Sequence, residues 1–129
     1  LRDGFKNGDI DFIASHHKPQ DWDNKTCEFE YAKDGIVGLE SEFGVIGICG
    51  LDFNQFIKMQ TENIKEIFNL PTTEIEIGSN ANLTLFNPNM EYIFGEEHIF
   101  SKSKNNPFIG KKLKGQTFGI INGEKVFLK

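Results

Sequence analysis

Two adjacent histidines stand in the segment Ile13-Ala14-Ser15-His16-His17-Lys18-Pro19-Gln20, and they are residues that can do chemistry. An imidazole side chain binds zinc and moves protons near neutral pH. Successive side chains of an extended segment face opposite ways, so His16 and His17 are not expected to share one metal ion. The pair therefore favours a role for a single histidine over a site that both side chains build.

The residues before and after the histidines predict a strand that leads into a loop. The apolar run Ile10 to Ala14 is short, and polar residues bound it on both sides. Such a run is typical of a buried parallel strand. From Lys18 to Asp34 the chain is polar and irregular, which predicts a long surface loop.

Helical signals follow this loop. A short, glycine-rich helix is expected over Leu39 to Cys49. Asp52 then offers an N-cap with Gln55 three residues later, which is the spacing of a capping box. The apolar positions from Phe53 to Phe68 keep helical spacing, as one helix or as two with Thr61 capping the second.

The last third of the chain predicts strands. Apolar and polar residues alternate over 74–77 and again over 82–85, the period of a half-buried strand. Thr117 to Ile121 and Glu124 to Leu128 flank Asn122-Gly123. Asn-Gly between apolar runs is the strongest short signal for a β-hairpin.

Composition narrows the class of protein. The 129 residues are 38% hydrophobic and 26% charged, with a net charge of −5, which is typical of a globular chain rather than a disordered one. The acidic balance argues against nucleic acid as a partner, and the lysine-rich stretch 102–114 is expected to be a solvated face. No apolar run approaches the ~20 residues of a membrane span, and no signal peptide opens the chain. We expect a cytoplasmic protein that does not enter a membrane.

Some chemically interesting residues have simpler explanations. Cys27 and Cys49 have no second cysteine at the spacing of a metal knuckle, so both are taken as unpaired thiols. His98 stands beside two glutamates in a polar stretch and is expected to be solvated. The spacing of Gly44 and Gly47 is not that of a nucleotide-binding loop, so close helix packing explains them better.

Four motifs resemble those of one enzyme family. The segment 13–20 resembles the Ile-Ala-Thr-Asp-His-Ala-Pro-His loop of dihydroorotases, and 35–41 is similar to their Gly-Ile-x-Gly-Leu-Glu-Thr. The segment 78–88 is similar to Gly-x-x-Ala-Asp-Leu-Val-Leu-Phe-Asp-Pro, and 101–110 to Ser-Lys-Ser-x-Asn-Thr-Pro-Phe-x-Gly. Order and spacing agree over nearly the whole chain, so it is identified as a member of the dihydroorotase group of the amidohydrolase superfamily.

The resemblance implies an α/β fold, as a C-terminal fragment of a TIM-barrel amidohydrolase. Residues 1–70 would be the end of the barrel, with its last strand, an active-site loop and terminal helices. Residues 71–129 would form part of the small flanking β-sandwich. A complete barrel needs about 250 residues. The N-terminal part of the same protein is therefore the first expected partner.

The resemblance also assigns roles to the loop, and the residues depart from the family there. His16 stands where the family has an aspartate that binds metal and carries a proton; a histidine can still do both, but it brings no negative charge. Gln20 replaces a histidine that contacts the substrate carboxylate, and it donates a hydrogen bond without a positive charge. Asp34-Gly35 stands where Phe-Gly lines the substrate, so an acid occupies a pocket meant for a dianion.

The function implied is the interconversion of dihydroorotate and carbamoyl aspartate in pyrimidine biosynthesis, with one or two zinc ions. The remaining metal ligands of the family, which are a His-x-His, a carboxylated lysine and two later histidines, lie upstream. The fragment alone is therefore expected to hold no cofactor and to be inactive. Three hypotheses remain open: a working dihydroorotase with an altered proton shuttle, a non-catalytic homologue that assembles with aspartate transcarbamoylase or with itself, and a related hydantoinase or allantoinase.

Overall fold

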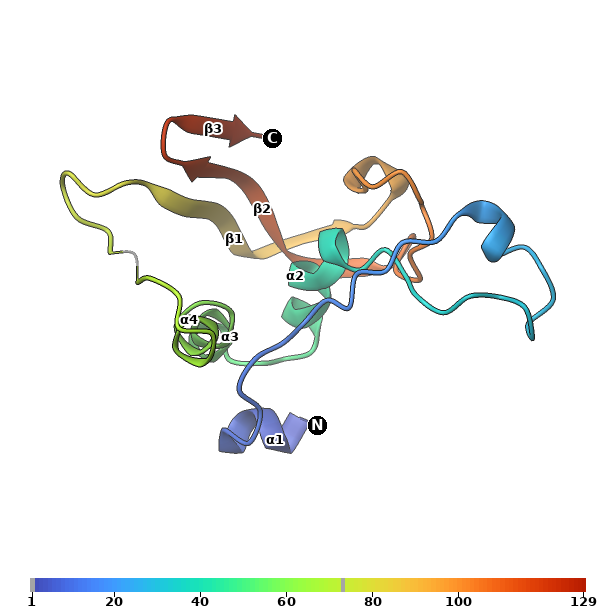
Figure 1. Ribbon diagram of the computed structural model, residues 1–129, viewed down its shortest axis with the longest axis horizontal. Helices are drawn as coiled ribbons and strands as arrows, with labels where there is room; N and C mark the ends of the chain where they lie inside the picture. The colour runs from blue at the N-terminus through green and yellow to red at the C-terminus, as the bar shows by residue number, and fades with distance from the viewer. Residues whose placement is uncertain (1, 73) are drawn as a thin grey trace.

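The computed structural model describes residues 2–72 and 74–129, and its α-helices precede its sheet along the chain (Figure 1). A three-stranded antiparallel sheet has the order β1-β2-β3, and α2 packs against β2. The loop that holds η1 projects to one side of the molecule, whereas α3 and α4 lie on the other. No helix of the described ranges is both long and apolar enough to cross a bilayer. The elements are α1 (Arg2–Asn7), η1 (Trp22–Asn24), α2 (Leu39–Ile48), α3 (Phe53–Gln60), α4 (Glu62–Ile67), β1 (Asn82–Ile93), η2 (Glu96–His98), β2 (Lys112–Asn122) and β3 (Lys125–Leu128).

The predicted hairpin is confirmed. β2 and β3 pair antiparallel, with Asn122 opposite Lys125. The turn is therefore Gly123-Glu124, one residue later than the predicted Asn122-Gly123. Gly123 has φ 58°, a left-handed conformation that glycine adopts without strain. β2 begins at Lys112, earlier than the predicted Thr117, because its first half pairs with the end of β1 beyond a register shift.

One small core joins the sheet to the segment that enters α2. Its side chains are almost fully buried, and they come from the segment before α2, from the segment around η2 and from β2. Burying a large aliphatic or aromatic side chain contributes about 1.5–3 kcal/mol. This core therefore ties the two halves of the chain together. Its members are Val37, Phe94, Ile99 and Leu113.

Two glycines allow α2 to approach β2 closely, as predicted. A Cβ on Gly44 would lie 2.7 Å from the Tyr92 hydroxyl, and a Cβ on Gly47 would collide with the backbone carbonyl of Lys114. Neither position leaves room for a side chain. The absence of a Cβ therefore sets the distance between this helix and the sheet.

The helical part after Asp52 consists of two helices. Asp52 accepts a hydrogen bond from the Gln55 amide at 2.9 Å, which confirms the predicted N-cap. The Gln55 side chain donates to the Phe5 carbonyl instead of returning to Asp52, so the reciprocal half of the capping box was predicted wrongly. Thr61 begins α4 without a side-chain cap, because its hydroxyl donates to the Ile57 carbonyl.

The strand predicted over Ile10 to Ala14 is wrong in this structure. The segment is extended but unpaired, and two of its carbonyls accept side-chain amides instead of strand partners. Asn63 donates to the Asp11 carbonyl at 2.7 Å, and Gln60 to the Ile13 carbonyl at 3.0 Å. A strand needs a neighbour for its ladder. None of the described residues lies alongside this run to supply one.

The strand predicted over 74–77 is also absent. Its two isoleucines, Ile75 and Ile77, are almost wholly solvent-exposed, and residues 74–77 lie outside the sheet. The alternation at 82–85, in contrast, falls within β1 and is confirmed. The difference lies in pairing, because only the second run faces β2.

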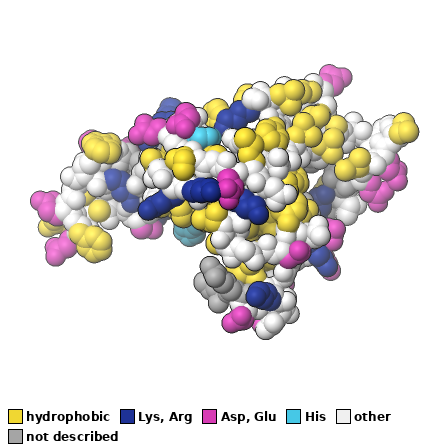
Figure 2. Space-filling model, turned by 180° about the vertical axis from the view of Figure 1, so that it is seen from behind, with side chains coloured by type: hydrophobic (Ala, Val, Ile, Leu, Met, Phe, Trp, Pro, Cys, Tyr) yellow, Lys and Arg dark blue, Asp and Glu magenta, His cyan; other side chains and the backbone are white. Residues whose placement is uncertain are grey.

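Many large hydrophobic side chains remain exposed on the sheet. Figure 2 shows hydrophobic side chains gathered over the end of the molecule where β2 and β3 lie. Isolated exposed apolar residues are normal, whereas a contiguous apolar patch marks a contact surface. The exposed side chains of these two strands are Phe118, Ile120, Val126, Phe127 and Leu128.

Replacing Gly47 by alanine tests the close approach of α2 to β2. Helix propensity alone predicts that Gly47→Ala stabilises the protein by up to about 1 kcal/mol. The collision with Lys114 predicts a loss of about 1–3 kcal/mol instead. Urea unfolding measures the sign. Leu39→Ala, at a 60% exposed position of the same helix, is the matched control and should change stability by less than about 0.5 kcal/mol. A stabilised Gly47→Ala protein would contradict the packing described.

Candidate functional site

Three segments far apart in sequence meet beside α2 and form what we call the loop crossing, defined as residues 16–18, 34–37 and 105–106. His17 and Ile36 form a parallel bridge, in which the Lys18 amide donates to the Ile36 carbonyl at 2.9 Å. On the other side, the Val37 amide donates to the Asn105 carbonyl at 2.8 Å. The middle segment is thus held between two others by backbone hydrogen bonds.

Asn105 and Asn106 fasten the loop crossing with their side chains. The Asn105 amide group donates to the Gly35 carbonyl at 3.0 Å. Asn106, which is 7% exposed, donates to the Val37 carbonyl and to the Ser41 hydroxyl, and its own side-chain oxygen accepts from the Phe108 amide at 2.8 Å. A buried amide with all its partners is stabilising, and it is costly to disturb.

His17 has a structural role at the start of α2. Its Nδ1 accepts the Leu39 amide at 3.1 Å, and it therefore satisfies one of the free N–H groups in the first turn of that helix. With Nδ1 used as an acceptor, the proton of the neutral ring belongs on Nε2. The nearby Glu40 Oε2 lies 3.9 Å from Nδ1. Prediction from sequence singled out His16 and missed this function of His17.

Glu40 links α2 to the segment after η2. Its Oε1 accepts hydrogen bonds from the Ser101 amide at 2.9 Å and from the Ser101 hydroxyl at 2.5 Å. Burial is the largest single influence on Glu40 and opposes its ionisation. The hydrogen bonds from Ser101, with smaller help from a backbone amide and from His17, together hold the pKa of its carboxyl below the ordinary value of 4.5. Glu40 is therefore a largely buried carboxylate, 12% exposed, that joins the helix to the loop.

The predicted site residues lie in or next to the loop crossing. His16 is solvent-exposed, with φ 49°. Gly35 has φ 115°, and a Cβ there would collide with the Lys18 carbonyl. Asp34 has an 81% exposed side chain, and both its oxygens lie 3.0 Å from Lys18 Nζ. This hydrogen-bonded lysine holds the pKa of Asp34 below its ordinary value. Gln20 is half-buried.

The structure brings Lys18, Asp34 and Gly35 together, but these residues do not build a zinc site. Among residues 2–72 and 74–129, no group of three histidine, cysteine, aspartate or glutamate side chains is placed to hold a metal ion. His16 alone offers one imidazole, whereas zinc sites have three or four protein ligands. The described part of the chain therefore does not fit zinc by itself.

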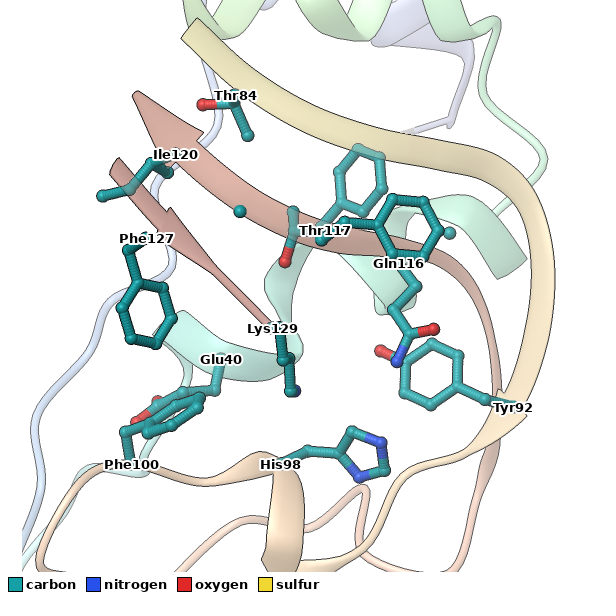
Figure 3. Close-up of a pocket in the computed structure, with 14 residues that line it drawn as sticks. Glu40, Thr84, Tyr92, His98, Phe100, Gln116, Thr117, Ile120, Phe127 and Lys129 are labelled. Carbon is teal, nitrogen blue, oxygen red and sulfur yellow. The ribbon is translucent and has the colours of Figure 1, made fainter. Parts of the chain in front are cut away.

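A separate cavity of about 240 Å³ lies between α2, η2 and the β2–β3 hairpin (Figure 3). None of the four predicted site residues lines it. His98 does, and its expected solvation was wrong: its side chain is 16% exposed and stacks 5.5 Å from the Phe94 ring. Its Nδ1 accepts the Gly95 amide at 3.0 Å. His98 therefore closes the η2 turn, a role that its two glutamate neighbours did not reveal.

No family model matches the chain, whereas proteins of known type match it from end to end. The dihydroorotase of Chlorobaculum tepidum is 36% identical over 136 residues, which is 100% of this chain and 30% of that protein. The dihydroorotase of Geobacter sp. strain M21 is 33% identical over 132 residues, with 98% and 31% covered. The D-hydantoinase (dihydropyrimidinase) from Thermus sp. superposes with a TM-score of 0.82 at 22% identity, covering 98% of this chain and 30% of that structure.

The structure comparison shows the fold of the chain, and the sequence comparisons show its family. The fold is that of a stretch of the Thermus D-hydantoinase structure. Over the whole of its length, the chain belongs to the dihydroorotase family. It spans about 30% of the length of the curated relatives that it matches. The family predicted from the motifs is thereby confirmed.

The buried amide of Asn106 is a test of the loop crossing. Asn106→Asp keeps the shape but places a carboxylate against the Val37 carbonyl, and we expect a loss of about 2 kcal/mol or more in the free energy of unfolding. The same change at the exposed Asn54 should alter stability by less than about 0.5 kcal/mol. Chemical denaturation of both variants makes the comparison. Equal, small changes in unfolding free energy for both variants would show that the contacts of Asn106 do not stabilise the protein.

The lowered pKa of Glu40 predicts a pH dependence of stability. Its stabilising contribution is fully present above the ordinary value of 4.5 and is lost as the pH falls through the lower value of the folded state. Glu40→Gln should therefore reduce the difference in unfolding free energy between pH 7 and pH 3. Glu62→Gln, at an exposed position of α4, is the control and should leave that difference unchanged. If Glu40→Gln leaves the difference in unfolding free energy between pH 7 and pH 3 unchanged, this carboxylate has no stabilising role.

Proposed function

We propose that this chain supplies one loop, and the loop crossing that holds it, to the substrate site of a dihydroorotase-like cyclic amidohydrolase. The metal ligands of that enzyme come from residues outside the chain. In this proposal His16, Gln20, Asp34 and Gly35 face the ring of the substrate. The chain alone is inactive, and it binds no metal of its own. The whole protein interconverts a cyclic amide and its ring-opened acid.

The observation that carries the proposal is the convergence of three of the matched motifs. Residues 13–20, 35–41 and 101–110 are the segments whose sequences resemble the family, and they meet at the loop crossing. Motifs that only packed a core would have no reason to hold one exposed loop in place. Here their hydrogen bonds hold the backbone that directly follows His16 and Asp34. A rigid support of this kind is what a substrate-facing loop needs.

The finer fold assignment is part of the same proposal. Residues 1–70 would be the end of a TIM barrel, and residues 71–129 a portion of a β-sandwich. Two features support the proposal that further residues of a longer protein pack against this chain. They are the unpaired run from Ile10 to Ala14 and the exposed hydrophobic side chains of β2 and β3. An unpaired run and exposed apolar side chains are both stabilised when further strands cover them. The remainder of a longer protein is the partner that we propose for both.

A non-catalytic homologue is the second candidate, and the residue types of the loop favour it. His16 contributes no negative charge, and Gln20 contributes no positive one. An enzyme that relied on the family's aspartate and histidine at these positions would lose proton transfer and carboxylate binding together. In that case the protein acts through assembly, either with itself or with aspartate transcarbamoylase.

A chimera distinguishes the two candidates. The stretch of the Chlorobaculum tepidum dihydroorotase that matches this chain is replaced by the chain itself. We expect the chimera to fold and to turn over dihydroorotate about 10²–10⁴-fold more slowly, because a positioned proton carrier contributes about that factor. His16→Asp with Gln20→His should then recover at least tenfold. Turnover and metal content are measured on the same samples.

Controls make each outcome of the chimera informative. Cys27→Ser, an exposed change in the same loop, should recover nothing. Recovery by the double change supports the assignment of the loop to the substrate site. A folded chimera that holds metal but stays inactive after the double change would contradict that assignment. A chimera that does not fold would contradict the structural equivalence itself.

A further inference from the structure

We propose that the site to which this chain contributes accepts an uncharged cyclic amide in preference to one that carries a carboxylate, and that the Lys18–Asp34 ion pair sets this preference. The inference rests on the proposed function, because it takes the loop crossing as part of the substrate site. It goes beyond that function by naming the charge class of the substrate.

The ion pair is placed by the backbone of the loop crossing. Lys18 Nζ lies 3.0 Å from each oxygen of the Asp34 carboxylate. The Lys18 amide donates to the Ile36 carbonyl, and Gly35 allows the two segments to approach closely because it has no Cβ. The lysine and the aspartate are therefore held on adjoining segments, even though both side chains are largely exposed.

The pair cancels the positive charge that a carboxylate ligand would need. A carboxylate is recognised by donors that carry a charge, and such hydrogen bonds are about twice as strong as neutral ones. Lys18 is already paired with Asp34, and Gln20 offers only a neutral amide. Over residues 16–35 the chain carries five acidic side chains and three lysines, so the loop adds no excess of positive charge. It therefore offers a carboxylate no net positive charge, whereas an uncharged ring needs none.

A purely structural role for the pair predicts a different result. An exposed ion pair contributes about 0–1 kcal/mol to stability and is screened by salt. If Lys18 and Asp34 only tether the loop crossing, removing either one changes stability slightly, and it weakens all ring ligands alike. If they select by charge, the two kinds of ring respond in opposite ways.

Two ligands with the same ring supply the test. Dihydroorotate carries a carboxylate, and 5,6-dihydrouracil is the same ring without it. Their affinities for the intact protein that carries this chain are measured by calorimetry at physiological ionic strength. We expect dihydrouracil to bind at least tenfold more tightly. Asp34→Asn, which frees Lys18, should raise the affinity for dihydroorotate about tenfold and leave that for dihydrouracil within twofold.

Two further variants separate the pair from the general charge of the loop. Asp23→Asn removes an exposed acid from the same loop and should change neither affinity by more than twofold. Lys18→Met added to Asp34→Asn should abolish the gain for dihydroorotate. Tighter binding of dihydroorotate by the unaltered protein, or no gain in Asp34→Asn, would overturn the charge preference while the proposed function stands. Absence of binding by both rings would overturn the proposed function, and the charge preference with it.

Discussion

The structure depends on the way in which the segment 35–37 is held between two others. Its backbone bonds to Lys18 on one side and to Asn105 on the other, and the Asn105 side chain adds a third bond. These contacts join parts of the chain that are about 20 and about 70 residues apart in sequence. Loop closure over such distances costs conformational entropy. The buried side chains beside the segment offset that cost, and Val37 is the first of them.

The same interaction couples the exposed loop to the sheet. Val37 belongs to the core that includes Leu113 of β2, and α2 begins directly after this segment. Gly44 and Gly47 then bring α2 against β2 so closely that no side chain fits at either position. A displacement of the helix would therefore reach the loop crossing through Ser41 and Asn106. The position of His16 and Asp34 is thus set by packing that lies well away from them.

Sequence predicted those features that depend on local chemistry. The hairpin around Gly123, the cap at Asp52 and the small residues of α2 were all found, because each is decided by a few neighbouring residues. Only the position of the turn was off, by one residue. The family could also be predicted, because its motifs keep their order. Pairing was less predictable. The runs at 10–14 and 74–77 have the pattern of strands, but a strand exists only where another lies beside it.

The candidate site, too, could be predicted only where local residues decide it. The sequence indicated the loop and the residues that depart from the family, but not the contacts that support them. His17 accepts a helix amide, and His98 packs on two aromatic rings. Neither role follows from residue type, because histidine serves as a ligand, a base or a neutral acceptor according to its partners. The Lys18–Asp34 pair likewise joins residues 16 positions apart across a long loop.

Hydrogen exchange in the intact protein tests the central claim most directly. The amides of Lys18, Val37 and Leu39 lie outside the strands or at the edge of a helix, yet the loop crossing gives each of them an acceptor. We expect these three amides to exchange much more slowly than those of Cys27 and Phe29, which lie in the exposed part of the same loop. Equally fast exchange at all five would show that the loop crossing does not hold the candidate site in place.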